Sequence, residues 1–511
     1  MTHNIGSGNR LFLRNLALVL VAALGLAACG GDSKSPNAEV PVEPVVPVEP
    51  VVPVEPDVPV EPDVPVEVPE TYSFYSRFEA GESSVSYSGQ TFRQVLIKEL
   101  IAYISGLTEE IDSGNFVPDA GDVVAELNYF FEFDSDTSGD DPLTISTTPD
   151  LLQATFNDIS NNKDLVSKIA GRDSKGQHKD WSTEFAGWSG AGGDSPENFV
   201  RALFAELDAL AVARANGEIP LGPTGAPIAN VYVTAEGQDL KQLIEKFLLM
   251  AVNYSQGTDD YLDNDLEDHG INSQNTEPGK EGAVYTSLEH IWDEGFGYFG
   301  AACDYADYSD DETAGKSGRD GWETGRHDTN GDGFIDLKSE YNFHAAVNAA
   351  KRDRGSSDEN PTDFSQQAID GFLLGRAIID AADGDFSQDD METLVAARDQ
   401  AVRAWEDVIA ATVVHYVNAV LVDMGNWGTE DYSFGDHAKH WSEMKAFAIG
   451  LQFNPRGQLS DEEFVKVMDL MGDAPVLPGE AEAEAYREGL VEAREILGAA
   501  HGFADSNVEN W

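Results

Sequence analysis

The chain has few cysteines, few cations and few alternating apolar–polar runs. Cysteine occurs only at Cys29 and Cys303 in 511 residues, which excludes a disulfide-stapled scaffold. Lysine and arginine number 32 against 92 acids, so the formal net charge is −60. Phosphate backbones repel such an acidic chain, which argues against nucleic-acid binding. Strand-like alternation is confined to the segment 230–234.

The first 28 residues have the pattern of an export signal. Two arginines precede an apolar run over 16–28, which is too short to span a bilayer comfortably. The run ends in LAACG, which resembles a bacterial lipobox and predicts a signal peptide over 1–28 and a lipid on Cys29. Glycine in place of aspartate after the cysteine implies, by the same resemblance, anchoring at the outer membrane of a Gram-negative bacterium, on its periplasmic or cell-surface side.

A proline-rich acidic linker over 29–70 follows the predicted anchor. Residues 41–70 are only proline, valine, glutamate and aspartate, with a repeat of period six. Proline at almost every third position prevents both helix and sheet, so we expect an extended spacer on the order of 90 Å long. A proline-rich ligand for another protein is the alternative interpretation.

Residues 71–511 are predicted to be all-α. Apolar residues recur at helical spacing, and long acidic, glycine-rich segments separate these runs. The expected fold is two helical bundles, with lobes at 71–325 and 341–511 joined by a loop at 328–340. The clearest predicted helices cover residues 91–105, 199–215, 240–252, 391–424 and 480–497.

Two helical segments share a pattern and indicate a faint internal duplication. Residues 288–300 read LEHIWDEGFGYFG and residues 439–450 read KHWSEMKAFAIG. Each segment places a histidine one or two residues before a tryptophan, a glutamate two residues after it, and a glycine at the end. The spacing between tryptophan and glycine differs by one residue, so the two registers do not fully agree.

The same segments predict metal ligands. Residues three and four apart project from one helix face, so His290 accompanies Asp293 and Glu294, and His440 accompanies Glu443. An imidazole and a carboxylate at this spacing can bind one cation, which would be iron or another transition metal. The alternative is that each histidine is buried and donates to a main-chain carbonyl.

These segments resemble the imelysin-like bacterial lipoproteins, described as peptidases or iron-regulated proteins. The segments 71–74 and 88–93 resemble a little-characterised branch of that family, and the resemblance would cover residues 71–511. It implies a paired helical-bundle fold and a role in iron or other metal uptake. The family motif is Gly-x-His-x-x-Glu, whereas Leu288 and Ala438 stand where its glycine belongs.

One loop has the pattern of a calcium site. From Asp328 onward, oxygen-bearing residues occupy positions 1, 3, 5 and 9, with glycine at 6 and isoleucine at 8, as in an EF-hand loop. The acid expected at position 12 stands at 13. The predicted ligands are Asp328, Asn330, Asp332, Phe334 through its carbonyl, Asp336 and Glu340. A solvated Asp/Gly turn is the alternative, and the expected role of calcium is to brace the loop between the lobes.

The expected function is that of an exported, lipid-anchored protein that binds a metal ion or an iron-bearing ligand for uptake. Its expected partners are the membrane, through the lipid on Cys29, and metal-uptake proteins. A metallopeptidase and a non-catalytic surface binding or adhesion module are the alternatives. No His-Glu-x-x-His pair is present, so the sequence predicts no catalytic residues.

Overall fold

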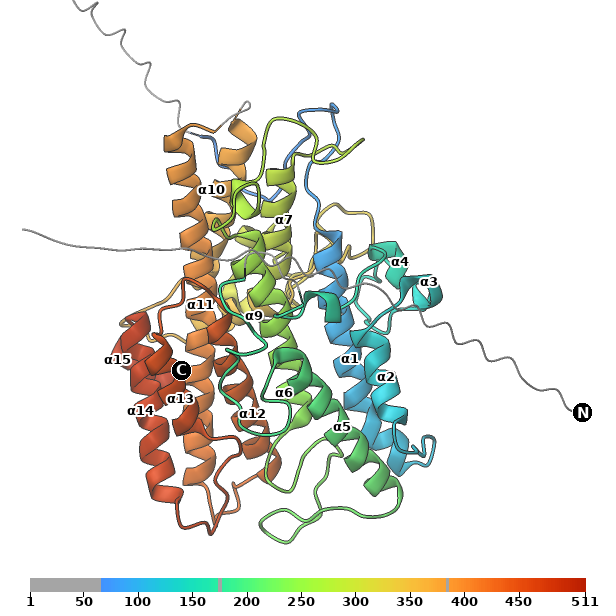
Figure 1. Ribbon diagram of the computed structural model, residues 1–511, viewed down its shortest axis with the longest axis vertical. Coiled ribbons are helices and arrows are strands. Elements are labelled where there is room, and N and C mark those ends of the chain that lie inside the picture. Colours follow the sequence, from blue (N-terminus) through green and yellow to red (C-terminus); the bar gives the residue numbers. More distant parts are fainter. Residues whose placement is uncertain (1–65, 173–176, 383–385) are drawn as a thin grey trace, which may run out of the picture. The chain divides into compact units, whose positions relative to one another are not determined.

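Fifteen α-helices, with short 3₁₀- and π-helical segments, make up just over half of the described residues, 66–172, 177–382 and 386–511, of this computed structural model (Figure 1). These residues contain isolated bridges but no strand, so the all-α prediction is confirmed. The segment 230–234, which favoured a strand, forms a turn in which Val233 makes a single bridge to Asp239. The predicted signal peptide, Cys29 and the linker up to residue 65 lie outside the described residues.

Each predicted helix is present, and most extend beyond the expected bounds. The first eight are α1 (Ser88–Asp112), α2 (Asp122–Phe131), α3 (Ser135–Ser138), α4 (Phe156–Ile159), α5 (Pro196–Ala215), α6 (Leu240–Leu248), α7 (Ser287–Phe299) and α8 (Asp310–Thr313). The others are α9 (His344–Arg354), α10 (Phe364–Ala381), α11 (Gln388–Gly425), α12 (Phe434–Gly450), α13 (Asp461–Met471), α14 (Ala483–His501) and α15 (Asp505–Asn510).

Local capping explains several helix ends. Ser195 caps α5 by accepting from the Asn198 amide, with proline at the first helical position. Ser387 and Asp390 form a capping box at the start of α11. Beyond α6 the chain winds more loosely, as π-helix over Leu249–Tyr254 and Gly257–Tyr261, whereas sequence periodicity predicted a regular helix up to residue 252.

The long helix α11 organises the second half of the protein. It packs against α9, α10, α12 and α14, and α12 packs in turn on α6 from the first half (Figure 1). Length and composition would allow α11 to cross a membrane, but 61% of its most apolar window is buried inside the protein. Buried apolar side chains from both halves belong to one core cluster. The proposed lobe boundary stays a prediction.

The two motif helices use their tryptophans in the same way. Trp292 on α7 donates to the Phe372 carbonyl of α10 at 3.0 Å, and Trp441 on α12 donates to the Met471 carbonyl of α13 at 3.2 Å. Both indoles are fully buried. A Cβ atom at Gly375 would lie 2.0 Å from the Trp292 ring, so glycine is required where α10 crosses α7.

Candidate functional site

The carboxylate of Asp293 on α7 is buried and fully engaged. One of its oxygens accepts from the Tyr72 hydroxyl at 2.8 Å and from Arg376 Nε at 3.0 Å. The other accepts from the Ser86 amide at 2.9 Å. Burial raises the pKa of Asp293, and the Arg376 guanidinium opposes that shift. This predicted metal ligand therefore serves an internal ion pair.

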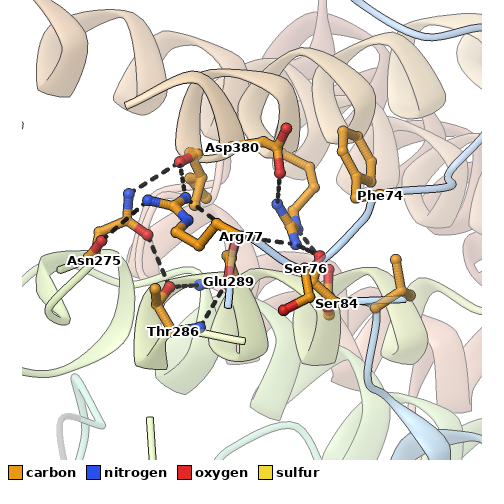
Figure 2. A network of polar contacts seen from close by, with 12 residues as sticks. Phe74, Ser76, Arg77, Ser84, Asn275, Thr286, Glu289 and Asp380 are labelled. Atoms are coloured by element: carbon orange, nitrogen blue, oxygen red, sulfur yellow. Dashed lines mark hydrogen bonds and ion pairs between the residues drawn. The ribbon is translucent and has the colours of Figure 1, made fainter. Parts of the chain in front are cut away.

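Glu289, to which the sequence analysis gave no role, extends the same network (Figure 2). Its Oε1 lies 3.2 Å from Arg77 Nη2 and 3.5 Å from Arg376 Nη2. Its Oε2 accepts from the Thr286 amide at 2.7 Å, which completes the N-terminal capping box of α7. Two arginines distant in sequence thus tie the segment before α1 and helix α10 to α7.

His290 and Glu294 lie together at the edge of that network. His290 Nδ1 is 2.9 Å from the Ser86 carbonyl, to which it must donate, and Nε2 is 3.8 Å from Glu294 Oε1. Glu294 also accepts from Gln90 at 2.9 Å, and the Tyr285 ring stacks on the imidazole. The structure therefore brings two of the three predicted α7 ligands together and turns Asp293 elsewhere.

On α12, Glu443 is buried but incompletely paired. Its Oε1 lies 3.8 Å from Lys246 Nζ, whereas its Oε2 has no hydrogen-bond partner among the described residues. His440 is linked instead to Asp423, with 2.8 Å between Nδ1 and Oδ2. The rings of Tyr416 and His440 lie with their centroids 6.2 Å apart. Burial raises the pKa of Tyr416, and the Glu443 carboxylate raises it further.

The surroundings of Glu443 are cationic, which is unusual in so acidic a protein. Lys246 Nζ is 2.7 Å from Glu245 Oε2 and 3.4 Å from His344 Nε2. Burial lowers the pKa of His344 well below its usual range, and Lys246, Lys351 and Lys98 lower it further. Like charges disfavour a bare metal ion at this position.

No recorded contact joins His290 on α7 to His440 on α12. Within the described residues, no group of three or more His, Cys, Asp or Glu side chains is placed to hold a metal ion. The metal assignments of both helices stay predictions.

The predicted calcium loop is folded by its own acidic side chains. Asp328 accepts from the amides of Asp332 at 3.0 Å and Gly333 at 2.8 Å. Asn330 accepts from the Asp332 amide at 2.8 Å, and Asp332 accepts from the Phe334 amide at 2.9 Å. Carboxylate and amide oxygens at positions 1, 3 and 5 thus turn toward one short stretch of backbone.

Glu340, the acid displaced to position 13, also faces this loop. Its Oε1 accepts from the amides of Thr329 at 3.0 Å and Asn330 at 3.2 Å, and its Oε2 accepts from the Asp336 amide at 2.9 Å. Burial raises the pKa of Glu340, while these main-chain hydrogen bonds oppose the rise. The extra residue therefore does not turn the carboxylate away.

The loop connects two distant segments of the first half. Ile335 forms a parallel bridge with Leu151, and Gln153 donates to Asp336 at 2.7 Å and accepts from the Leu337 amide at 3.0 Å. On another side, the Cys303 amide donates to the Ser339 carbonyl at 2.7 Å. A bound ion there would stiffen both connections.

Sequence reasoning missed the arginines that decide the character of these sites. Arg376 carries no motif, and only its long-range partners reveal its role. Arg352 belongs to the run Lys351-Arg352-Asp353-Arg354, three cations in four residues of a strongly acidic chain. That local excess of positive charge was a usable signal, since isolated basic runs in acidic proteins indicate anion contacts.

Comparison with known proteins gives a family match for the first half of the chain. Residues 69–311 match the family described as "Domain of unknown function (DUF4856)". The matched part contains α1 to α7 and ends within α8, so Arg376 of the α7 network, the loop at 328–340 and α12 lie beyond it. No curated protein and no solved structure gives a significant match.

Proposed function

We propose that the protein is an exported, lipid-anchored binding protein whose helical domain is stabilised by calcium at the loop over 328–340. The observation that supports calcium most directly is the position of Glu340, whose two carboxylate oxygens both turn into the loop. Calcium takes six to eight oxygen ligands in flexible geometry, and this loop offers carboxylate, amide and carbonyl oxygens. The ion would relieve repulsion among its four acids.

A calcium titration followed by thermal unfolding tests this proposal. Calcium should raise the melting temperature of the wild-type chain, because a ligand that binds only the folded state stabilises it by mass action. Asp328→Asn and Glu340→Gln should each remove most of that rise. Asp136→Asn, in an exposed acidic segment far from the loop in sequence, is the matched control and should respond as wild type does. A calcium response that persists in both loop variants would refute the assignment.

The lipid anchor has a separate test. Cys29→Ala should move the protein from the membrane fraction to the soluble fraction and abolish labelling by a radioactive fatty acid. Comparison of inner- and outer-membrane fractions would then place the wild-type protein, which we propose lies at the outer membrane. Unchanged fractionation of the Cys29→Ala variant would exclude lipidation as the anchor.

Capture of an iron-bearing ligand for uptake is the second candidate function. It is supported by the unpartnered oxygen of Glu443 on the helix that also carries His440, and by the resemblance to imelysin-like lipoproteins. The cationic surroundings favour iron carried in an anionic chelate over the bare ion. Elemental analysis of the purified protein should find a transition metal that His440→Ala or His290→Ala removes. Calcium alone in wild type and in both variants would overturn this candidate.

A further inference from the structure

Cationic side chains gather along one face of α9, in a groove that the predicted metal sites do not account for. We define this α9 groove by the cations Lys98, Lys246, Lys351 and Arg352, together with His344. His344, Asn348, Lys351 and Arg352 follow one another at helical spacing, so they share a face of α9. Lys246 reaches that face from α6, within 3.4 Å of His344 Nε2.

Arg352 is the central observation. Its side chain is nine-tenths buried, yet no hydrogen bond or ion pair with another described residue is recorded for its guanidinium, and its Nε is enclosed without a partner. Burial lowers the pKa of Arg352 to about 10, and Tyr416, Asp353 and Glu443 oppose that shift. Buried arginines are normally paired, so an unpaired one indicates a missing anion.

Arg376 is a buried arginine of the same protein that is paired with carboxylates, although its Nη1 has no hydrogen-bond partner among the described residues. Its buried guanidinium lies 3.0 Å from Asp293 Oδ1 and 3.5 Å from Glu289 Oε1, and Ser84 accepts a further hydrogen bond at 2.7 Å. Arg352 is also buried, but no ion pair or hydrogen bond joins its guanidinium to a carboxylate among the described residues.

The charge balance of the groove is opposite to that of the chain. Five cations lie close enough to act on the pKa of His344 or on that of another cation of the groove: Lys98, Lys246, Lys316, Lys351 and Arg352. Three carboxylates oppose them, Glu245, Asp353 and Glu443. Partial desolvation and its neighbours Lys246, Arg352 and Lys316 lower the pKa of Lys351, which is the response expected of crowded cations.

An open cleft adjoins the groove at its His344 end, and Lys98 and His344 belong to both. It has a volume of about 210 Å³ and is lined by charged side chains that include Lys98, Glu245 and Arg326, together with His344. On the α11 and α12 side of α9, the rings of Tyr416 and Phe447 lie nearly parallel, with centroids 6.3 Å apart and an interplanar angle of 10°. The volume of the cleft is large enough for several waters or a small organic ion.

We propose that the α9 groove binds a small organic oxyanion that carries carboxylate or phosphate groups. The planar guanidinium of Arg352 presents two parallel donors to one such group, and Lys351 adds a second positive charge. The free Oε2 of Glu443 accepts from a hydroxyl or amino donor on the same ligand, which selects a substituted anion over a simple one. This proposal rests on the second candidate function, capture of an iron-bearing ligand, and names the chemistry of that ligand. Binding of metal-free anions tests it separately from any binding of metal.

Isothermal titration of the purified full-length chain with citrate and, in a second arm, with inorganic phosphate tests this proposal. Chelator-treated protein and metal-free ligand solutions keep calcium and iron out of the result. We expect one binding site with a dissociation constant of about 1 mM or tighter for at least one of the two ions. Citrate binding alone would assign the carboxylate class, and phosphate binding alone the phosphate class.

Arg352→Gln should weaken that binding about tenfold or more, because a charge-assisted bidentate contact is lost. Arg354→Gln is the matched control: it removes the same charge from the same helix, but Arg354 is exposed and paired with Asp311. Its affinity should stay within about twofold of wild type, since exposed charges are screened by salt. Melting curves confirm that each variant is folded, and the exposed Lys351→Gln carries the test if Arg352→Gln does not fold.

Three outcomes would overturn the proposal. Neither ion binds the wild type at concentrations up to about 10 mM. Arg352→Gln, or Lys351→Gln in its place, binds as the wild type does. Arg354→Gln loses as much affinity as Arg352→Gln, which would reduce the effect to the general charge of the helix.

Discussion

Helices α7 and α12 carry the same short pattern and use it differently. On each, a buried tryptophan donates to a carbonyl of the neighbouring helix, and an acid stands three residues after the histidine. On α7 that acid, Asp293, is enclosed by Arg376, Tyr72 and the Ser86 amide. On α12 the corresponding Glu443 keeps one oxygen without a partner.

The difference arises outside the pattern. Arg376 on α10 reaches the carboxylates of α7 directly, whereas Arg352 on α9 approaches the α12 acid without forming an ion pair with it. The α7 region is thereby a closed structural network, and the α12 region keeps both a cation and an acid available. A shared motif therefore indicates shared packing, while the chemistry depends on the residues that other helices bring.

The largest expected effect is a loss of folding stability when the α7 network loses its buried arginine. Arg376→Gln should destabilise the protein by about 3–5 kcal/mol, because it leaves the carboxylates of Asp293 and Glu289 buried without their cation. Urea unfolding measures the change. The exposed ion pair of Arg354 with Asp311 gives the control, since Arg354→Gln should cost at most about 1 kcal/mol. Equal losses of unfolding free energy in the two variants would contradict the structural role of the α7 network.

Acid should act on the α12 region through His437. Burial lowers the pKa of this histidine to about 4, although Asp423 opposes the shift. The unfolded chain takes up a proton as pH falls below about 6.5, and the folded protein does so only near pH 4, so stability is lost across that interval. The loss should amount to about 1–3 kcal/mol in urea unfolding at a series of pH values. His437→Gln should reduce the dependence of the unfolding free energy on pH across that interval. An unchanged dependence would contradict His437 as the source of the acid sensitivity.

The smallest expected effect sharpens the contrast between the two arginines. Arg352→Met should change the free energy of unfolding by less than about 1 kcal/mol, or raise it, because no ion pair is lost and a buried charge is removed. Arg376→Met, its matched counterpart, should destabilise strongly. Chemical denaturation of both variants in ligand-free buffer checks this, and a large loss for Arg352→Met would show that its guanidinium is paired after all.

Local patterns in the sequence located the helices that they singled out, although α2, α9, α10 and α13 were not among them. Apolar spacing located α1, α5, α6, α11 and α14, but it placed the start of α11 at residue 391 and missed the capping box of Ser387 and Asp390. The strand-like segment 230–234 misled because its alternation covers only five residues and finds no partner strand. The π-helical stretch after α6 keeps the apolar spacing of a regular helix, so periodicity could not distinguish it.

The candidate sites were only partly predictable. The order of ligands along 328–340 placed the loop, but not the inward turn of Glu340, which depends on three main-chain amides. Helical spacing put His290 and Asp293 on one face, yet Arg376, more than eighty residues away, takes Asp293 for itself. Long-range pairing of this kind leaves no local trace in one sequence.

A crystal structure of the protein grown or soaked with citrate tests the central claim most directly. The account predicts a carboxylate of the ligand at about 3 Å from the Arg352 guanidinium, with Arg376 still bound to Asp293 and Glu289. A direct ion pair between Arg352 and Glu443, with the α9 groove free of ligand, would contradict it.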